Sequence, residues 1–287
     1  MKISGFTIIR NGVKLDYPFI ESIQSILPVC DEFIVCIGQC EDATASYIKQ
    51  ITDTKIKIIH SPWNLENRVA GTELAIQTNI AMQHITGDWG FYIQADEVLP
   101  DGYQDKVRES CERYLNDSKV EGLLFDYVHF YGNYNFICTG RSWYRREVRV
   151  IRNHIGIQSY ADAQGFRVNE RKINAKKINV PMYHYGHVRK PEGHKNKNFE
   201  MSKLWHSDQE ISNRYDISKP FIYENTQTLK PFSGRHPKLM EQRISEVNWQ
   251  FIYDPKTVRR KIKDVILDKY EALTGRRLFE FKNYKII

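Results

Sequence analysis

Asp96 and Glu97 come shortly after an apolar, aromatic-rich stretch, residues 89–93, and precede Leu99 and Pro100. A short run of this composition predicts a buried strand. In an open α/β sheet, ligands gather at the carboxyl ends of strands, and carboxylate oxygens suit Mg²⁺ or Mn²⁺. Both acids would then stand at the mouth of a crevice, where a divalent ion could hold a diphosphate. The alternative is a strand-ending turn with solvated acids.

The elements that must position these acids alternate between β-branched runs and amphipathic helical patterns. This alternation predicts an α/β fold with a mostly parallel sheet and helices on both faces. The expected strands are residues 3–9, 32–37, 55–60, 89–93 and 123–130, with helices between them.

The regular alternation ends after residue 130. Residues 131–192 are rich in Tyr, Trp, Arg and Gly, with strand-like pieces at 147–151 and 177–180, as in segments that complete a substrate site. From residue 196 helical patterns return, at 239–249 and 258–273 among others. We therefore predict a catalytic domain over residues 1–195 and a C-terminal helical region over 196–287 packed on it.

Composition narrows the protein class. The 287 residues include no apolar run of the ~18 residues that span a bilayer, and no pattern of a signal peptide. Five cysteines without CxxC pairs indicate reduced thiols in a cytoplasmic protein.

Charge divides the chain into an acidic and a basic half. Residues 1–138 carry 11 Lys and Arg against 19 Asp and Glu, whereas residues 139–287 carry 31 against 16. The basic half could meet nucleotide phosphates, an anionic glycan, acidic lipids or nucleic acid. Nucleic acid is disfavoured because the acidic half would repel a polyanion and no recognised motif is present. The basic, apolar segment 258–263 could contact the inner face of a membrane peripherally, although helix packing explains its apolar positions equally well.

Several motifs occur in a familiar order between residues 3 and 190. They are Arg10-Asn11 after the first strand, the segment DEFIVCIGQCEDAT at the second, GDWGFYIQADEVLP, and later YHYGHVR. In this ordered set the chain resembles glycosyltransferase family 2. The resemblance implies a GT-A fold, a nucleoside-diphosphate-sugar donor, a divalent metal and transfer with inversion.

The resemblance places Asp96 at the metal-binding position of the family's DXD motif. Gln94 stands where the first aspartate of that motif would be, so it can hydrogen-bond to ribose or sugar but carries no charge. Ile37 stands where many members have an aspartate that contacts the base or ribose. The chain therefore departs from the family at one position of the metal-binding motif and at one position that contacts the nucleotide.

A second metal ligand is expected in the later Tyr- and Gly-rich turn. His184 is the first candidate and His187 the reserve, because a neutral imidazole can complete a coordination sphere of oxygens. Arg189 lies next to them in the sequence and would suit an anionic leaving group.

Inverting transfer requires a base for the acceptor hydroxyl. Asp162 is our candidate, with Asp126 and Glu147 as competitors; a turn-forming Asp162 paired with Arg167 is the structural alternative.

The nucleotide pocket is expected to use residues near the first two strand ends. We predict that Arg10, Asn11, Gln39 and Trp63 line it. The expected donor is UDP- or GDP-linked, and the acceptor a hydroxyl of a glycan or a lipid-linked sugar. Two rivals remain: a nucleotidyltransferase on a similar sheet, and a non-catalytic polyanion- or glycan-binding protein whose metal site has decayed.

Overall fold

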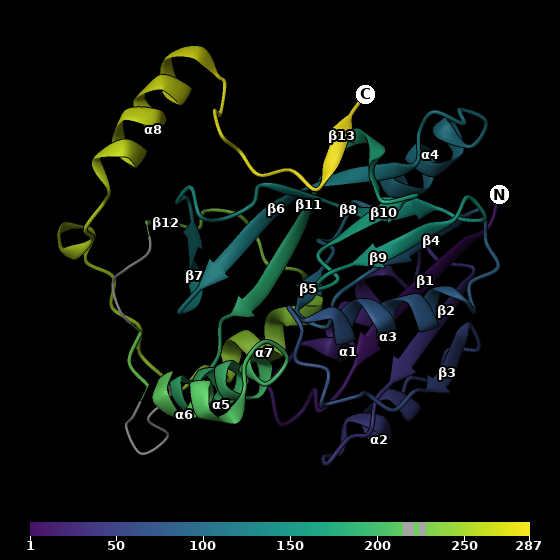
Figure 1. Cartoon of the computed structure of the whole chain (residues 1–287), viewed down its shortest axis with the longest axis horizontal. Coiled ribbons are helices and arrows are strands. Elements are labelled where there is room, and N and C mark those ends of the chain that lie inside the picture. The colour runs from purple at the N-terminus through teal and green to yellow at the C-terminus, as the bar shows by residue number, and fades with distance from the viewer. Residues whose placement is uncertain (215–220, 224–227) are drawn as a thin grey trace.

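Residues 1–214, 221–223 and 228–287 are described in the computed structural model (Figure 1). Its strands are β1 (Ile3–Ile9), β2 (Glu32–Ile37), β3 (Ile56–His60), β4 (Trp89–Tyr92), β5 (Glu97–Val98), β6 (Gly122–Tyr131), β7 (Asn133–Cys138), β8 (Arg146–Arg152), β9 (Ile157–Tyr160), β10 (Gly165–Val168), β11 (Arg171–His187), β12 (Leu229–Pro231) and β13 (Tyr284–Ile286). They form one sheet with the main order β3-β2-β1-β4-β8-β6-β11-β10-β9.

The predicted α/β fold with a parallel core is confirmed. Strands β1 to β4 run parallel to one another, in the order β3-β2-β1-β4. β1, β2 and β4 are buried along their whole length, as expected for strands covered on both faces. Past β4 the sheet becomes mixed, because β8 runs antiparallel to both β4 and β6.

One strand is much longer than its sequence pattern predicts. A strand is expected only at 177–180, but β11 spans Arg171–His187 and pairs in parallel with β6. Two irregularities in that pairing interrupt the register, so polar and apolar residues do not alternate cleanly along it. The end of β11 also pairs with the short β5, which brings His184 opposite Glu97.

Helices cover both faces of the sheet. Their bounds are α1 (Phe19–Ile26), α2 (Thr44–Lys49), α3 (Thr72–Met82), α4 (Gln104–Tyr114), α5 (Pro191–Ser202), α6 (Asp208–Arg214), α7 (Glu241–Ser245) and α8 (Ile262–Thr274). Apolar residues of α1, α2 and α4 pack in one core cluster with β1, β2 and β4, and α3 packs in a second cluster on the opposite face. The sheet is therefore enclosed where it is parallel, which leaves its strand ends to form a site.

The C-terminal part differs in detail from its predicted helices. A helix expected over 239–249 is reduced to a 3-10 turn, Lys238–Met240, and the short α7. The helix expected over 258–273 begins at Ile262, and β13 returns to pair with β11. Within the described ranges, no helix has the length and apolar content needed to cross a bilayer.

Candidate active site

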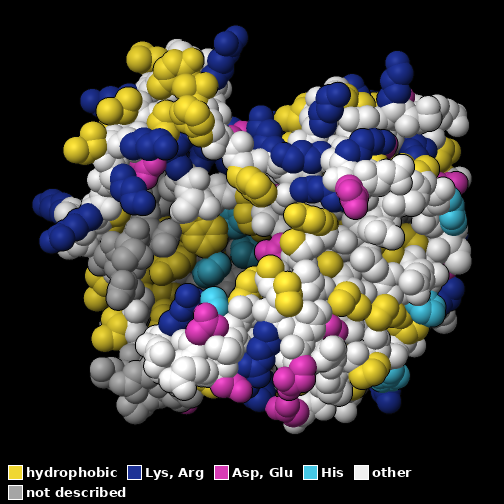
Figure 2. Space-filling view, in the orientation of Figure 1, with side chains coloured by type: hydrophobic (Ala, Val, Ile, Leu, Met, Phe, Trp, Pro, Cys, Tyr) yellow, Lys and Arg dark blue, Asp and Glu magenta, His cyan; other side chains and the backbone are white. Residues whose placement is uncertain are grey.

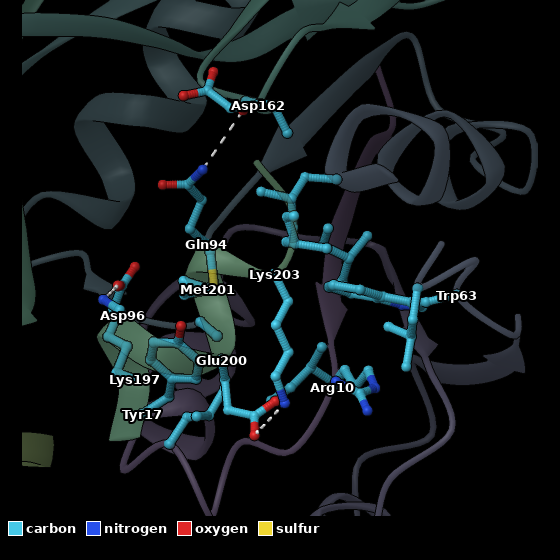
Figure 3. A pocket seen from close by; sticks show the side chains of 18 of the residues that line it. Arg10, Tyr17, Trp63, Gln94, Asp96, Asp162, Lys197, Glu200, Met201 and Lys203 are labelled. Atoms are coloured by element: carbon cyan, nitrogen blue, oxygen red, sulfur yellow. Dashed lines mark hydrogen bonds and ion pairs between the residues drawn. The ribbon is translucent and has the colours of Figure 1, made fainter. Parts of the chain in front are cut away.

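A cavity of about 720 Å³ opens at the carboxyl ends of β1 and β4. Its lining comes from the end of β1 and the segment after it, Glu41 after β2, the β3–α3 loop with Leu74 of α3, the turn after β4, the β9–β10 turn, the end of β11, and helix α5 with the residues that follow it. Figure 3 shows Trp63 and Arg10 at one end of the cavity and Asp96, Lys197 and Tyr17 at the other. This is the predicted location for a ligand in a sheet of this type.

The two adjacent carboxylates have different roles. Asp96 lines the cavity, whereas Glu97 is fully buried and does not stand at its mouth. Arg149 binds Glu97 in a bidentate pair, with Nε 2.8 Å from Oε2 and Nη2 2.7 Å from Oε1. The Tyr127 hydroxyl also donates to Glu97 Oε1 at 2.6 Å. Glu97 therefore holds the turn after β4 in place, and Asp96 is presented to the cavity.

Asp96 faces one imidazole and one ammonium group. His184 Nε2 lies 3.7 Å from Asp96 Oδ1, and Lys197 Nζ lies 3.1 Å from Oδ2. Burial alone would raise the pKa of Asp96, but Lys197, His184 and Arg189 outweigh it and hold that pKa well below its usual range. Burial and the nearby Arg189 lower the pKa of Lys197 to about 8. Asp96 is thus an ionised, accessible ligand at neutral pH.

A hydrogen-bond chain fixes the tautomer of His184. His129 Nε2 lies 2.7 Å from the carbonyl oxygen of Tyr144, so it must carry a proton and donate. Burial lowers the pKa of His129 to about 3 and that of His184 to about 4, so both rings are neutral at pH 7. Their Nδ1 atoms lie 3.1 Å apart, and since His129 Nδ1 is unprotonated, His184 Nδ1 donates. His184 Nε2 therefore presents a lone pair towards Asp96.

Two electron-rich atoms facing each other favour a cation between them. Gly186 leaves the space for one, because a β-carbon there would lie 2.6 Å from His184 Nε2 and 2.7 Å from Asp96 Oδ2. The chemistry of this nitrogen and oxygen pair suits a divalent metal. Over the described residues there is no group of three His, Cys, Asp or Glu side chains for a metal. The pair fits an ion that takes its other ligands from phosphate oxygens and water.

The opposite end of the cavity combines an aromatic ring with basic side chains. Trp63, Arg10 and Arg68 all line it. Each carries a buried N–H donor, Nε1 of the indole and Nε of each guanidinium, that has no acceptor among the described residues. The guanidinium groups also pair with carboxylates, Arg10 with Glu41 at 3.2 Å and Arg68 with Asp208 at 2.7 Å. Basic side chains beside an aromatic ring fit a ligand with a planar ring and anionic oxygens.

The β9–β10 turn carries Asp162 to the cavity. The flanking Ala161 and Ala163 have left-handed backbones, with φ of 52° and 59°, a conformation that alanine adopts at a cost. Gln94 Nε2 approaches the carbonyl oxygen of Ala163 at 3.5 Å, so it links the turn after β4 to this hairpin (Figure 3). Asp162 and Gln94 thus lie on the same side of the cavity.

Three predicted site residues, Asn11, Gln39 and Arg189, are not among the residues that line the cavity. Asn11 is fully buried, and its Oδ1 accepts the Glu41 N–H at 2.8 Å. Gln39 forms two hydrogen bonds with the backbone of Trp63, and so positions that ring without lining the cavity. Arg189 is fully buried and donates to the carbonyl oxygens of Leu15 and Gly186.

Of the three alternative candidates, one lines the cavity and two do not. His187 lines the cavity, and burial lowers its pKa well below the usual value. Asp126 pairs with Arg146 and Lys177 away from it. Glu147 is buried, which raises its pKa to about 7, and accepts from Gln164. Neither Asp126 nor Glu147 is among the lining residues.

Sequence reasoning missed helix α5 as part of the site. Lys197, Glu200 and Met201 of α5 line the cavity, and so does Leu204, just past the end of the helix. Their spacing of three and four residues is that of one helix face, and this face mixes charged and apolar side chains, which was the available signal. His129 was missed because its role depends on contact with His184, a partner 55 residues away.

No family model matches the sequence, and no curated protein matches it. Solved structures that align include S. aureus TarS, with 12% identity and a TM-score of 0.41, over 70% of this chain and 39% of that one. The complex of TarS 1–349 with UDP aligns at 13% identity and TM-score 0.41, over 74% of this chain and 68% of that one.

A mannosyltransferase, PcManGT from Pyrobaculum calidifontis, in complex with GDP-Man and Mn²⁺, aligns at 20% identity and a TM-score of 0.32. The alignment covers 42% of this chain and 34% of that one. The chain thus spans well under half the length of the full TarS structure and of this mannosyltransferase. All three alignments have identities of 20% or less and TM-scores below 0.5.

Proposed function

We propose that the chain is a glycosyltransferase that takes a nucleoside-diphosphate sugar as donor and a divalent ion, Mn²⁺ or Mg²⁺, as cofactor. The observation that carries the proposal is the convergence of Asp96 and the His184 Nε2 lone pair at one end of the cavity, with Trp63 and the guanidinium groups of Arg10 and Arg68 at the other. A ligand matching both ends has a planar base and a diphosphate.

Different residues of the site would bind different parts of the donor. The indole of Trp63 and the guanidinium groups of Arg10 and Arg68 suit the nucleoside and its first phosphate. Asp96 and His184 would hold the metal, which stabilises the negative charge that develops on the departing diphosphate. Lys197, whose ammonium group is already at this end, would supply a further positive charge to the same oxygens.

We place the sugar and acceptor beside the β9–β10 turn. Gln94 offers both a donor and an acceptor to sugar hydroxyls, as its neutral amide allows. Asp162, half-buried on the cavity side, is our candidate for the base that removes the acceptor proton. Direct attack by that hydroxyl inverts the anomeric centre. The acceptor class we favour is a glycan or lipid-linked hydroxyl.

A uridine or guanosine diphosphate donor is the first to test. The assay is a thermal-shift panel of nucleoside diphosphates and their sugars, with and without Mn²⁺. A ligand at 100 times its Kd adds about 2.7 kcal/mol of stability, which a melting curve resolves. We expect one nucleotide to stabilise the protein only with Mn²⁺ present, and Asp96→Ala to abolish that shift.

Asp162→Asn is the matched control, since this side chain lines the same cavity but lies outside the proposed metal site. It should keep the Mn²⁺-dependent shift and lose turnover. If no nucleotide stabilises the wild type, the proposal fails. Released pyrophosphate in place of nucleoside diphosphate would instead identify a nucleotidyltransferase, and binding unchanged in Asp96→Ala would identify a non-catalytic binding protein.

A further inference from the structure

Helix α8 lies apart from the central sheet, at the edge of the molecule (Figure 1). None of its 13 residues is buried. It nevertheless has two distinct faces, and these differ in both charge and hydropathy. The contacts of the acidic face determine which way the other face points.

The acidic face is held by arginines of the segment after β7. Arg141 Nη1 lies 3.0 Å from Asp268 Oδ1 and 2.8 Å from Glu271 Oε2. Arg145 Nη1 lies 2.9 Å from Glu271 Oε1. Several charge pairs that converge on one side of a helix fix its rotation about its own axis. The side opposite to Asp268 and Glu271 therefore faces solvent.

The outward face is apolar. Ile262, Ile266, Tyr270 and Leu273 are spaced by four, four and three residues, which places them in one stripe. Their exposed fractions are 79%, 60%, 37% and 87%. Figure 2 shows hydrophobic side chains gathered on the lobe that α8 forms in Figure 1, with Lys and Arg around them. An apolar stripe this exposed on a helix indicates a binding surface.

Basic side chains border the stripe on both sides. At 100° per residue, Lys263 and Lys269 fall on opposite edges of it, and both are exposed. Residues 258–287 carry nine Lys and Arg against four Asp and Glu. Two of those acids, Asp268 and Glu271, are turned inward to Arg141 and Arg145. The outward face is therefore apolar at its centre and cationic at its edges.

We propose that the outward face of α8 docks on an anionic lipid bilayer. Such a surface offers both partners at once: acyl chains for the apolar stripe and headgroup charges for the lysines on its edges. A second copy of this chain would place like charges opposite each other, which disfavours self-association through this face. The inference stands independently of the proposed function, because it uses no residue of the cavity.

The test is co-sedimentation of the full chain with vesicles. We expect binding to vesicles containing 30% phosphatidylglycerol, weakening as salt is raised, and no binding to pure phosphatidylcholine. Lys263→Glu combined with Lys269→Glu should weaken partitioning by about 30-fold or more, given what two cations contribute near such a surface. Ile266→Asp combined with Leu273→Asp should abolish it.

Ile76→Asp is the matched control, since this isoleucine is 44% exposed on α3 and lies on another helix. It should bind vesicles as the wild type does. Melting temperatures of all variants verify folding. The proposal is overturned if the wild type ignores anionic vesicles or if the Ile266 and Leu273 variant still binds them. It is equally overturned if light scattering shows a wild-type dimer that those two substitutions dissociate.

Discussion

Lys197 is expected to compete with the metal for Asp96. Its ammonium group donates to Asp96 Oδ2 at 3.1 Å and to the carbonyl oxygen of Gly186 at 2.9 Å. A metal ion that binds Asp96 and His184 must either bind beside the positive charge of Lys197 or displace the lysine from Asp96. Lys197→Met keeps the length and apolar stem of the side chain and removes the charge. We therefore expect the variant to bind Mn²⁺ more tightly than the wild type when no nucleotide is present.

The size of the effect follows from the contact that the metal must disrupt. A hydrogen bond between two charged groups contributes about 1.5–3 kcal/mol to stability. Removing that competitor should tighten nucleotide-free Mn²⁺ binding by about 10- to 150-fold. With a nucleoside diphosphate present the difference should shrink, because the wild-type lysine gains phosphate oxygens as an alternative partner.

The assay is a Mn²⁺ titration followed by the electron paramagnetic resonance signal of free Mn²⁺. Lys203→Met is the matched control: this lysine lines the same cavity but pairs with Glu200, at 3.0 Å, and not with Asp96. Its affinity for Mn²⁺ should equal that of the wild type. Equal affinities of wild type and Lys197→Met, or a loss of binding in that variant, would refute the reasoning.

Three further substitutions test the proposed metal site and two buried charged groups near it. Gly186→Ala should abolish Mn²⁺ binding in the same titration, because its methyl group would lie within 2.7 Å of both proposed metal ligands; retained affinity would contradict the site's geometry. Arg149→Met leaves Glu97 buried without its partner and should cost about 3–5 kcal/mol in urea denaturation, whereas an unchanged midpoint would show that the pair is dispensable. Glu147 has a folded pKa of about 7 against 4.5, so the folded state holds its proton more tightly and wild-type stability falls as pH rises between these values. Relative to wild type, Glu147→Gln should gain about 3 kcal/mol between pH 4.5 and 8, and a flat difference would oppose this assignment.

The parallel half of the fold was accessible from sequence because its signals are local. The strands at 3–9 and 32–37 are predicted with their observed bounds, since short β-branched runs between helical patterns define them. β11 was not accessible in this way, because its pairing with β6 depends on partners far along the chain and its register is irregular. Tertiary context, not local pattern, determines such a strand.

The candidate site likewise combines residues that local sequence patterns predict with residues whose roles depend on tertiary contacts. Asp96 was predicted from the end of a strand, and His184 from a motif, and the structure brings them within 3.7 Å. Glu97 looked equivalent to Asp96, but Asp96 lies in the turn after β4, whereas Glu97 begins β5 and is buried where Arg149 binds it. The mixed helix face signals only that Lys197 is placed beside other site residues; its pairing with Asp96 arises only when α5 packs against the turn after β4.

The most direct test of the central claim is a crystal of the protein with Mn²⁺ and a nucleoside diphosphate, measured at the manganese absorption edge. The account predicts one anomalous peak at coordination distance from both Asp96 and His184 Nε2, with phosphate oxygens completing its ligands. A bound nucleotide whose phosphates contact Lys197, with no anomalous peak beside Asp96, would contradict it.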